Sequence, residues 1–244
     1  MSRIAVAGGT GVVGRHVVEV ARARGHEVVV LARSEGVDLT TGAGLDLSGI
    51  DAVIDVTSIR ATGRKDAEEF FGSVTRTLLD AETAAGVTHH VALSIVGIDD
   101  IPYGYYQGKQ EQERLVTSGG VPWSILRATQ FHEFSEQSLG FVTMGLFSFV
   151  PTMLSQPVAA VEVAEKLIDL VESGPSGRTP DLGGPEKLQM VDLARRVNAQ
   201  RNLGRRVVKL PVPGATGRGM RSGALCPDSG DRGRITFEDW LTSV

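Results

Sequence analysis

A tyrosine and a lysine four residues apart are the side chains of this sequence best suited to proton transfer. All three tyrosines lie in "YGYY" at 103–106, and Tyr105 is followed four residues later by Lys109. On a helix this spacing places both side chains on one face. An ammonium group beside a phenol favours the phenolate, so we expect Lys109 to lower the pKa of Tyr105. Tyr106 would point about 100° away, which favours Tyr105 as the partner of Lys109.

A serine upstream of this pair has a hydroxyl group that could hold a substrate carbonyl. Ser94 lies in "HHVALSIVG", at the C-terminal end of an apolar run that predicts a strand. Ligands of parallel sheets gather at that end of the strands. Capping of the strand end explains Ser94 equally well when it is taken alone. We include it as a third catalytic candidate because Tyr105 and Lys109 follow so closely.

Three glycines in "GGTGVVG" could form a cradle for a dinucleotide. In a chain with 30 glycines among 244 residues this spacing is weak evidence alone, but here it joins a first apolar run to a first helix. Gly8 would allow a tight turn, Gly11 would let a phosphate approach the backbone, and Gly14 would let the helix pack closely on the strand. The free N–H groups at the start of that helix then suit a pyrophosphate.

The end of the second apolar run indicates which dinucleotide is bound. An acidic side chain there would accept the ribose 2′-OH of NADH, whereas a basic one would suit the 2′-phosphate of NADPH. The sequence is "VVVLARS", with Arg33 followed by Ser34 and no acidic residue before Glu35. This favours NADP(H) as the cofactor. The alternative is that Arg33 is only a solvated strand end.

Short apolar runs that alternate with amphipathic helices predict the element order needed to position these residues. Such a pattern is typical of an α/β fold with a doubly wound parallel sheet, Rossmann-like. The polar, Gly-rich segment between the second and third strands stays unassigned, apart from a short strand at 37–39. We expect strands near 3–7, 27–32, 52–57, 89–94 and 123–127, and helices near 12–24, 65–85 and 104–118.

The signals change after residue 131, where prolines divide the chain into short pieces. Helices are expected near 161–172 and 189–201. We therefore predict a cofactor-binding domain over 1–130. The remainder, 131–244, is expected to form a smaller substrate-binding lobe that packs on the first domain and is not an independent domain.

Composition excludes several classes of function. The net charge of −4 and the absence of a basic run with interleaved aromatics argue against nucleic acid and anionic membranes as partners. The basic stretch at 195–206 is read as a solvated helix face. No apolar stretch reaches the roughly 20 residues of a membrane span. A single cysteine, Cys226, fits a cytoplasmic location, and His132 with Glu133 lacks a third ligand for a metal site.

The motifs together resemble the atypical short-chain dehydrogenase/reductase superfamily, specifically its NmrA-like, NAD(P)H-binding branch. The resemblance rests on "GGTGVVG", "LARS", "SIVGID", "YYQGK" and "PWSILRATQFHEF", and it covers about residues 3–134 well and the rest loosely. It implies a cofactor site along the ends of the strands, with Lys109 on the nicotinamide ribose. The implied cofactor-binding residues are Gly8, Thr10, Gly11, Val12, Val13, Arg33, Ser34, Asp38, Leu39, Val56, Thr57, Ser58, Lys109, Ala128, Thr129 and Gln130.

Two functions follow from this resemblance. The first is an NADPH-dependent reductase that transfers hydride to a small apolar carbonyl, quinone or enone while Tyr105 gives or receives the proton. The second is a non-catalytic NADP(H)-sensing regulatory protein of the NmrA type. A pure sensor has no need of Tyr105 and Lys109, so their spacing favours the enzyme. A sugar-nucleotide epimerase is a weaker third reading, and we expect a monomer or homodimer.

Overall fold

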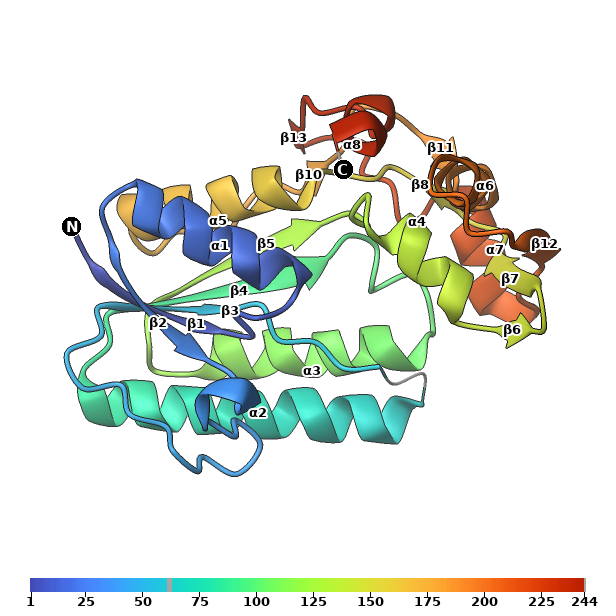
Figure 1. The fold of residues 1–244 in the computed structure, drawn as a ribbon. Coiled ribbons are helices and arrows are strands. Elements are labelled where there is room, and N and C mark those ends of the chain that lie inside the picture. The colour runs from blue at the N-terminus through green and yellow to red at the C-terminus, as the bar shows by residue number, and fades with distance from the viewer. Residues whose placement is uncertain (61–62, 244) are drawn as a thin grey trace. The chain divides into compact units, whose positions relative to one another are not determined.

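The computed structural model describes residues 1–60 and 63–243, which fall into two compact units (Figure 1). Unit 1 consists of residues 1–94, 103–127 and 161–179. Unit 2 consists of residues 95–102, 128–160 and those from 180 onward. Across the described residues, no helix is both long enough and apolar enough to cross a bilayer.

Unit 1 is built on a parallel sheet in which β1 lies between β2 and β3. This strand pairs in parallel with β2 on one side and β3 on the other, and β3 pairs in parallel with β4. The side chains of β1 from Ile4 to Ala7 have no solvent exposure, as expected for a parallel sheet covered on both faces. The order is β2-β1-β3-β4-β5, with β9 beside β5. The strands are β1 (Arg3–Ala7), β2 (Glu27–Leu31), β3 (Ala52–Asp55), β4 (His89–Ile95), β5 (Trp123–Ala128) and β9 (Gly177–Arg178).

Helices cover both faces of this sheet, which confirms the prediction of a doubly wound α/β fold. One face carries α1 (Val12–Ala23) and α5 (Ala160–Ser173), and the other carries α2 (Arg64–Ala85) and α3 (Gly104–Ser118) (Figure 1). Helix α2 ends at Gly86, whose φ of +73° suits a glycine cap. The three helices predicted in this part of the chain are confirmed to within one residue at each end.

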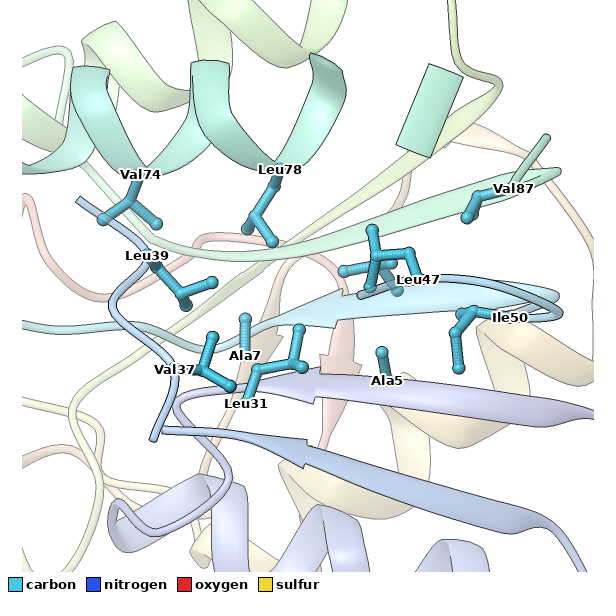
Figure 2. Close-up of a cluster of buried hydrophobic side chains, with 11 residues drawn as sticks. Ala5, Ala7, Leu31, Val37, Leu39, Leu47, Ile50, Val74, Leu78 and Val87 are labelled. Carbon is cyan, nitrogen blue, oxygen red and sulfur yellow. The ribbon is translucent and has the colours of Figure 1, made fainter. Parts of the chain in front are cut away.

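The segment between β2 and β3 contributes side chains rather than a helix to the core. It begins with a 3-10 turn, η1 (Arg33–Glu35), and its only pairing is an isolated bridge between Asp38 and Ala43, so the strand predicted at 37–39 is wrong. Figure 2 shows its apolar side chains between the sheet and α2. The cluster includes Ala5, Ala7, Leu31, Val37, Leu39, Leu47, Ile50, Val53, Val74, Leu78 and Val87.

Unit 2 contains smaller sheets and short helices. Its three-stranded sheet places β7 (Phe147–Pro151) between β6 (Thr143–Met144) and β12 (Arg206–Leu210). The helix predicted near 189–201 is confirmed as α6, whereas the sequence signals missed the short strands. The other elements are α4 (Phe134–Gln137), η2 (Ser138–Gly140), β8 (Leu154–Ser155), β10 (Leu182–Gly183), β11 (Leu188–Gln189), α6 (Met190–Gln200), α7 (Gly214–Ser222), β13 (Asp231–Arg232) and α8 (Phe237–Ser243).

The compact units follow a different division from a single boundary at residue 130. Residues 161–179, which the sequence assigned to the lobe, lie in unit 1. Strand β9 pairs there with β5, and Arg24 after α1 forms ion pairs with Asp169 and Glu172 of α5 at 2.7 and 2.9 Å. These contacts join the segment to the first 130 residues.

Candidate functional site

The glycine loop, residues 8–14, joins β1 to α1. Gly8 has a φ of +80°, and a Cβ there would lie 3.0 Å from the Val56 carbonyl oxygen. A Cβ on Gly14 would lie only 2.1 Å from the Gly8 carbonyl oxygen. The tight turn at Gly8 and the close packing at Gly14 are therefore confirmed, while the phosphate contact at Gly11 stays a prediction.

The start of α1 has the properties of an anion site. The Gly11 N–H donates to the Gly8 carbonyl at 2.9 Å, and the helical bonding begins with the Arg15 N–H donating to the Gly11 carbonyl. The N–H groups of Val12, Val13 and Gly14 thus precede the first intrahelical bond. Thr10 and Gly11 are exposed, and the first turn holds no acidic residue. A cofactor phosphate therefore fits this end of α1.

The turn after β2 places Arg33 beside an acidic residue that its sequence neighbours did not reveal. Arg33 and Ser34 are exposed in η1. Asp38 accepts hydrogen bonds from the hydroxyl and the N–H of Thr40, and these bonds, together with the nearby Arg33 charge, lower its pKa. The Leu39 side chain lies in the core and is not available to the adenine.

The loop after β3 lies against the glycine loop and is held by a buried carboxylate. Asp55 has no solvent exposure, and its Oδ1 accepts hydrogen bonds from the N–H and hydroxyl of Thr57 at 2.9 and 2.7 Å. A Cβ on Gly8 would lie 3.1 Å from the Thr57 Cα. Ser58 follows, exposed, with its hydroxyl 2.9 Å from the Tyr105 hydroxyl. The structure therefore brings together the predicted residues of the glycine loop, the β3 end and α3.

Tyr105 does not have the lowered pKa that the spacing predicted. Burial raises its pKa, and the hydrogen bond with Ser58 offsets this only in part. Its ring packs edge-on against Phe71 of α2, with centroids 5.4 Å apart. The neighbouring Tyr106 is 7% exposed, and burial raises its pKa as well. Both phenols therefore hold their protons at neutral pH.

Lys109 is directed at a backbone carbonyl and an aromatic ring. It is 3% exposed, its Nζ donates to the Leu93 carbonyl at 2.6 Å, and the same atom lies 4.8 Å from the centroid of the Phe71 ring. Burial lowers its pKa to about 8, although the charges of Asp55 and Glu113 act in the opposite direction. Tyr105 and Lys109 thus share the ring of Phe71, and desolvation dominates both pKa values.

Ser94 is buried at the end of β4 and faces α3. Burial acts to raise the pKa of Glu113, but the hydrogen bonds and charge of Arg127, together with the charge of Arg178, act in the opposite direction and the pKa is lowered. Two guanidinium groups reach the same carboxylate, from Arg127 at 2.7 Å and from Arg178 at 2.8 Å. The buried Ser94 Oγ has no hydrogen-bond partner among the described residues, and its role toward a substrate stays a prediction.

The remaining predicted residues lie in unit 2, where protein contacts hold them. The Thr129 hydroxyl donates to the Gln156 carbonyl at 2.5 Å, and the carbonyls of Ala128 and Gln130 accept hydrogen bonds from Val96 and Val158. His132 is fully buried, bonds to the Ile235 carbonyl and stacks on Trp240. No group of three metal-ligating side chains occurs among residues 1–60 and 63–243.

Sequence reasoning missed three residues at the centre of this arrangement, namely Asp55, Phe71 and Gln112. An acidic residue that closes the apolar run "AVID" was a usable signal, because a charge at the buried end of a strand needs a partner. Phe71 and Gln112 gave none, since their roles depend on how α2 and α3 pack.

Solved structures share this fold over almost the whole chain. A NAD-dependent NDP-hexosamine 5,6-dehydratase involved in tunicamycin biosynthesis is 17% identical with a TM-score of 0.69, covering 99% of this chain and 98% of that one. An NADPH-dependent quinone oxidoreductase from Escherichia coli is 17% identical with a TM-score of 0.66, covering 98% of each chain. A UDP-glucose 4-epimerase from Thermus thermophilus, in complex with NAD, is 20% identical with a TM-score of 0.64, covering 99% and 92%.

Similarity in sequence defines the family. No curated protein matched the chain. A model of the family described as NAD(P)H-binding matches residues 45–173, a range that begins after the glycine loop and includes Asp55, Ser58 and all of α3. Because this range is more than half of the chain, the protein belongs to the NAD(P)H-binding family, in agreement with its resemblance to the atypical short-chain dehydrogenases/reductases.

Proposed function

We propose that this protein is an NADPH-dependent reductase that transfers hydride to a small apolar carbonyl, quinone or enone. The observation that carries the proposal is the hydrogen bond between the hydroxyls of Ser58 and Tyr105, one helical turn from the buried Lys109. This bond joins Tyr105 to the loop after β3, whose Thr57 lies against Gly8, and this supports Tyr105 as the proton donor. The fold likeness to a quinone oxidoreductase is compatible with this reading but does not select it over an epimerase or dehydratase.

The chain offers the groups that a dinucleotide needs. The first turn of α1 would hold the pyrophosphate, and Arg33 with Ser34 would meet the 2′-phosphate. Lys109 retains donors beyond its bond to Leu93 for the hydroxyls of the nicotinamide ribose. When bound, the nicotinamide supplies the hydride, and the protein supplies position and a proton.

Tyr105 is the proposed proton donor. Reduction of a carbonyl or quinone requires a proton at the oxygen, and a tyrosine with a raised pKa holds its proton at neutral pH. The Ser58 hydroxyl, at 2.9 Å and exposed, can return a proton from solvent to Tyr105 after each turnover. This role differs from the one that the spacing predicts, in which Lys109 favours the phenolate.

Exposed apolar side chains in unit 2 support an apolar acceptor. Phe141, Val142, Met144 and Leu146 have exposed fractions between 48% and 65% around β6. We also propose that the protein is a monomer or homodimer and that it is cytoplasmic. The single thiol, Cys226, is buried and free, which fits a reducing compartment.

The test is NADPH oxidation by the purified protein across quinones, ketones and enones, with Tyr105→Phe and Tyr106→Phe as matched variants. We expect Tyr105→Phe to lower kcat by roughly 10²–10⁴-fold with little change in NADPH affinity. Tyr106→Phe should retain most activity. If the protein binds NADPH but oxidises it with none of the acceptors, the sensing function replaces the reductase.

A further inference from the structure

We infer that Asp55 is a positioning residue: its buried carboxylate balances the Lys109 ammonium and fixes the two segments that carry Ser58 and Tyr105. The inference assigns a role to a side chain that is outside the predicted site. Its importance for catalysis rests on the proposed function, but the interaction between Asp55 and Lys109 can be measured in the protein without any ligand.

Asp55 links β3 to its own loop and to α3. Its Oδ1 accepts both hydrogen bonds from Thr57, which fixes the loop that leads to Ser58. Its Oδ2 accepts a hydrogen bond from the Gln112 amide at 2.7 Å. One buried carboxylate therefore fixes the segments on both sides of the Ser58–Tyr105 hydrogen bond.

The helix supplies the second part of the geometry. Tyr105, Lys109 and Gln112 lie at positions i, i+4 and i+7 of α3, and residues with this spacing share a helix face. Gln112 has no solvent exposure, like Asp55. Its bond to Asp55 therefore sets the rotation of the face that presents Tyr105 and Lys109.

The charges around Lys109 leave Asp55 as its counterion. Its own helix contributes Glu113, which is already shared by Arg127 and Arg178. Strand β4 contributes the Leu93 carbonyl, α2 contributes the uncharged Phe71 ring, and β3 contributes Asp55.

A second buried basic side chain near Asp55 has its own partner. His90 of β4 pairs with Glu82 at 2.8 Å, and both side chains are fully buried. The hydrogen bonds that Asp55 accepts come from the uncharged groups of Thr57 and Gln112. The charge of Asp55 raises the pKa of both His90 and Lys109, but at His90 the hydrogen-bonded Glu82 contributes more.

The first experiment measures the pKa of Lys109 by NMR in ¹³C-lysine-labelled, ligand-free protein. Asp55→Asn keeps the shape of the side chain and removes its charge. The Gln112 amide can rotate to accept from the new amide, because its Oε1 has no other partner. We expect the pKa of Lys109 to fall by roughly one unit.

Two matched variants separate charge from structure. Gln112→Met removes the hydrogen bond but leaves the carboxylate, so the pKa of Lys109 should not fall. The exchange variant, Asp55→Asn with Gln112→Glu, preserves a hydrogen bond between the two positions and returns one negative charge three residues from Lys109. It should bring the pKa back toward that of the wild type. Should Asp55→Asn fail to fold, the exchange variant and Gln112→Met still give the comparison.

NADPH binding then connects this effect to the site. With the pKa of Lys109 lowered by one unit from about 8, the charged fraction at pH 8 falls about fivefold, so the Kd for NADPH in Asp55→Asn should rise about fivefold at pH 8 and little at pH 6. An unchanged pKa of Lys109 in Asp55→Asn, or no recovery in the exchange variant, overturns the inference. Loss of NADPH binding in the wild type would instead refute the proposed function and leave the NMR result standing.

Discussion

The glycine loop presents backbone groups, whereas the α3 cluster, formed by Asp55, Tyr105, Lys109, Gln112 and Glu113, presents side chains. In the glycine loop a single added carbon would meet the main chain, at 2.1 Å for Gly14. In the α3 cluster the side chains are held by hydrogen bonds and ion pairs with their neighbours. The glycine loop therefore does not tolerate added side-chain volume, and the α3 cluster is sensitive to a change of charge.

This difference predicts opposite responses to substitution. A small apolar side chain should damage the glycine loop at any pH. An isosteric change of charge should leave the cluster folded and alter how it responds to pH.

The largest effect is expected for Gly14→Ala. Its Cβ would lie inside the contact distance of the Gly8 carbonyl, which is backbone and cannot rotate away. We expect a loss of about 3 kcal/mol in the free energy of unfolding, measured with urea, and weaker NADPH binding.

Gly120→Ala is the control, because a Cβ at Gly120 meets nothing within 4 Å. Its effect should stay within about 0.5 kcal/mol. Equal stability of the Gly14 and Gly120 variants would contradict the prediction that the glycine loop does not tolerate an added side chain.

The second effect concerns Lys109 and pH. Its folded pKa, about 8, lies below the ordinary value of 10.5, so the unfolded chain binds more protons between these values. Stability contributed by this group therefore rises with pH across that window. Between pH 7 and 9.5 the gain should be about 2 kcal/mol for the wild type.

Lys109→Met should lack this gain. The check is the difference between the unfolding free energies of the two proteins at pH 7 and at pH 9.5. Parallel curves for wild type and variant would show that burial does not determine the charge state of Lys109.

The smallest effect tests the edge of the glycine-loop site. Arg33 is exposed, and a contact between its guanidinium and a 2′-phosphate predicts at least tenfold tighter binding of NADPH than of NADH, or about 1.4 kcal/mol. Arg33→Ala should abolish this preference, as measured by fluorescence titration with each cofactor. Asp38→Asn should increase it, because the neighbouring carboxylate repels the phosphate. A wild type that prefers NADH would contradict the assignment.

Much of the backbone architecture was predictable from the sequence. The strands and helices of unit 1 are marked by apolar runs and by their periodicity. The turn between β1 and α1 is marked by Gly8, Gly11 and Gly14, because glycine adopts backbone conformations that other residues avoid. The segment before β3 was not assigned, since its fold depends on Leu39 and Leu47 reaching α2. Pairings such as β7 with β12 join residues about 60 positions apart, and no local signal encodes them.

The sequence predicted which residues of α3 lie together, but it did not predict the pKa values of their side chains. Spacing correctly placed Tyr105 and Lys109 on one helix but led to the wrong direction for the pKa of Tyr105. Desolvation depends on Phe71 and on the surrounding strands, which spacing does not report. The same limit applies to Asp55, whose partners are Thr57 nearby and Gln112 from a distant helix.

The discontinuous composition of unit 1 has a consequence for synthesis on the ribosome. Strand β5 is complete at Ala128, but its neighbour β9 begins only at Gly177, and α5 comes between them. At roughly 5–20 residues per second, the nascent chain carries an open sheet edge for about 2–10 s before β9 is made. During that interval the unpaired edge of β5 can pair with another chain, and a ribosome pause after residue 130 would lengthen the exposure.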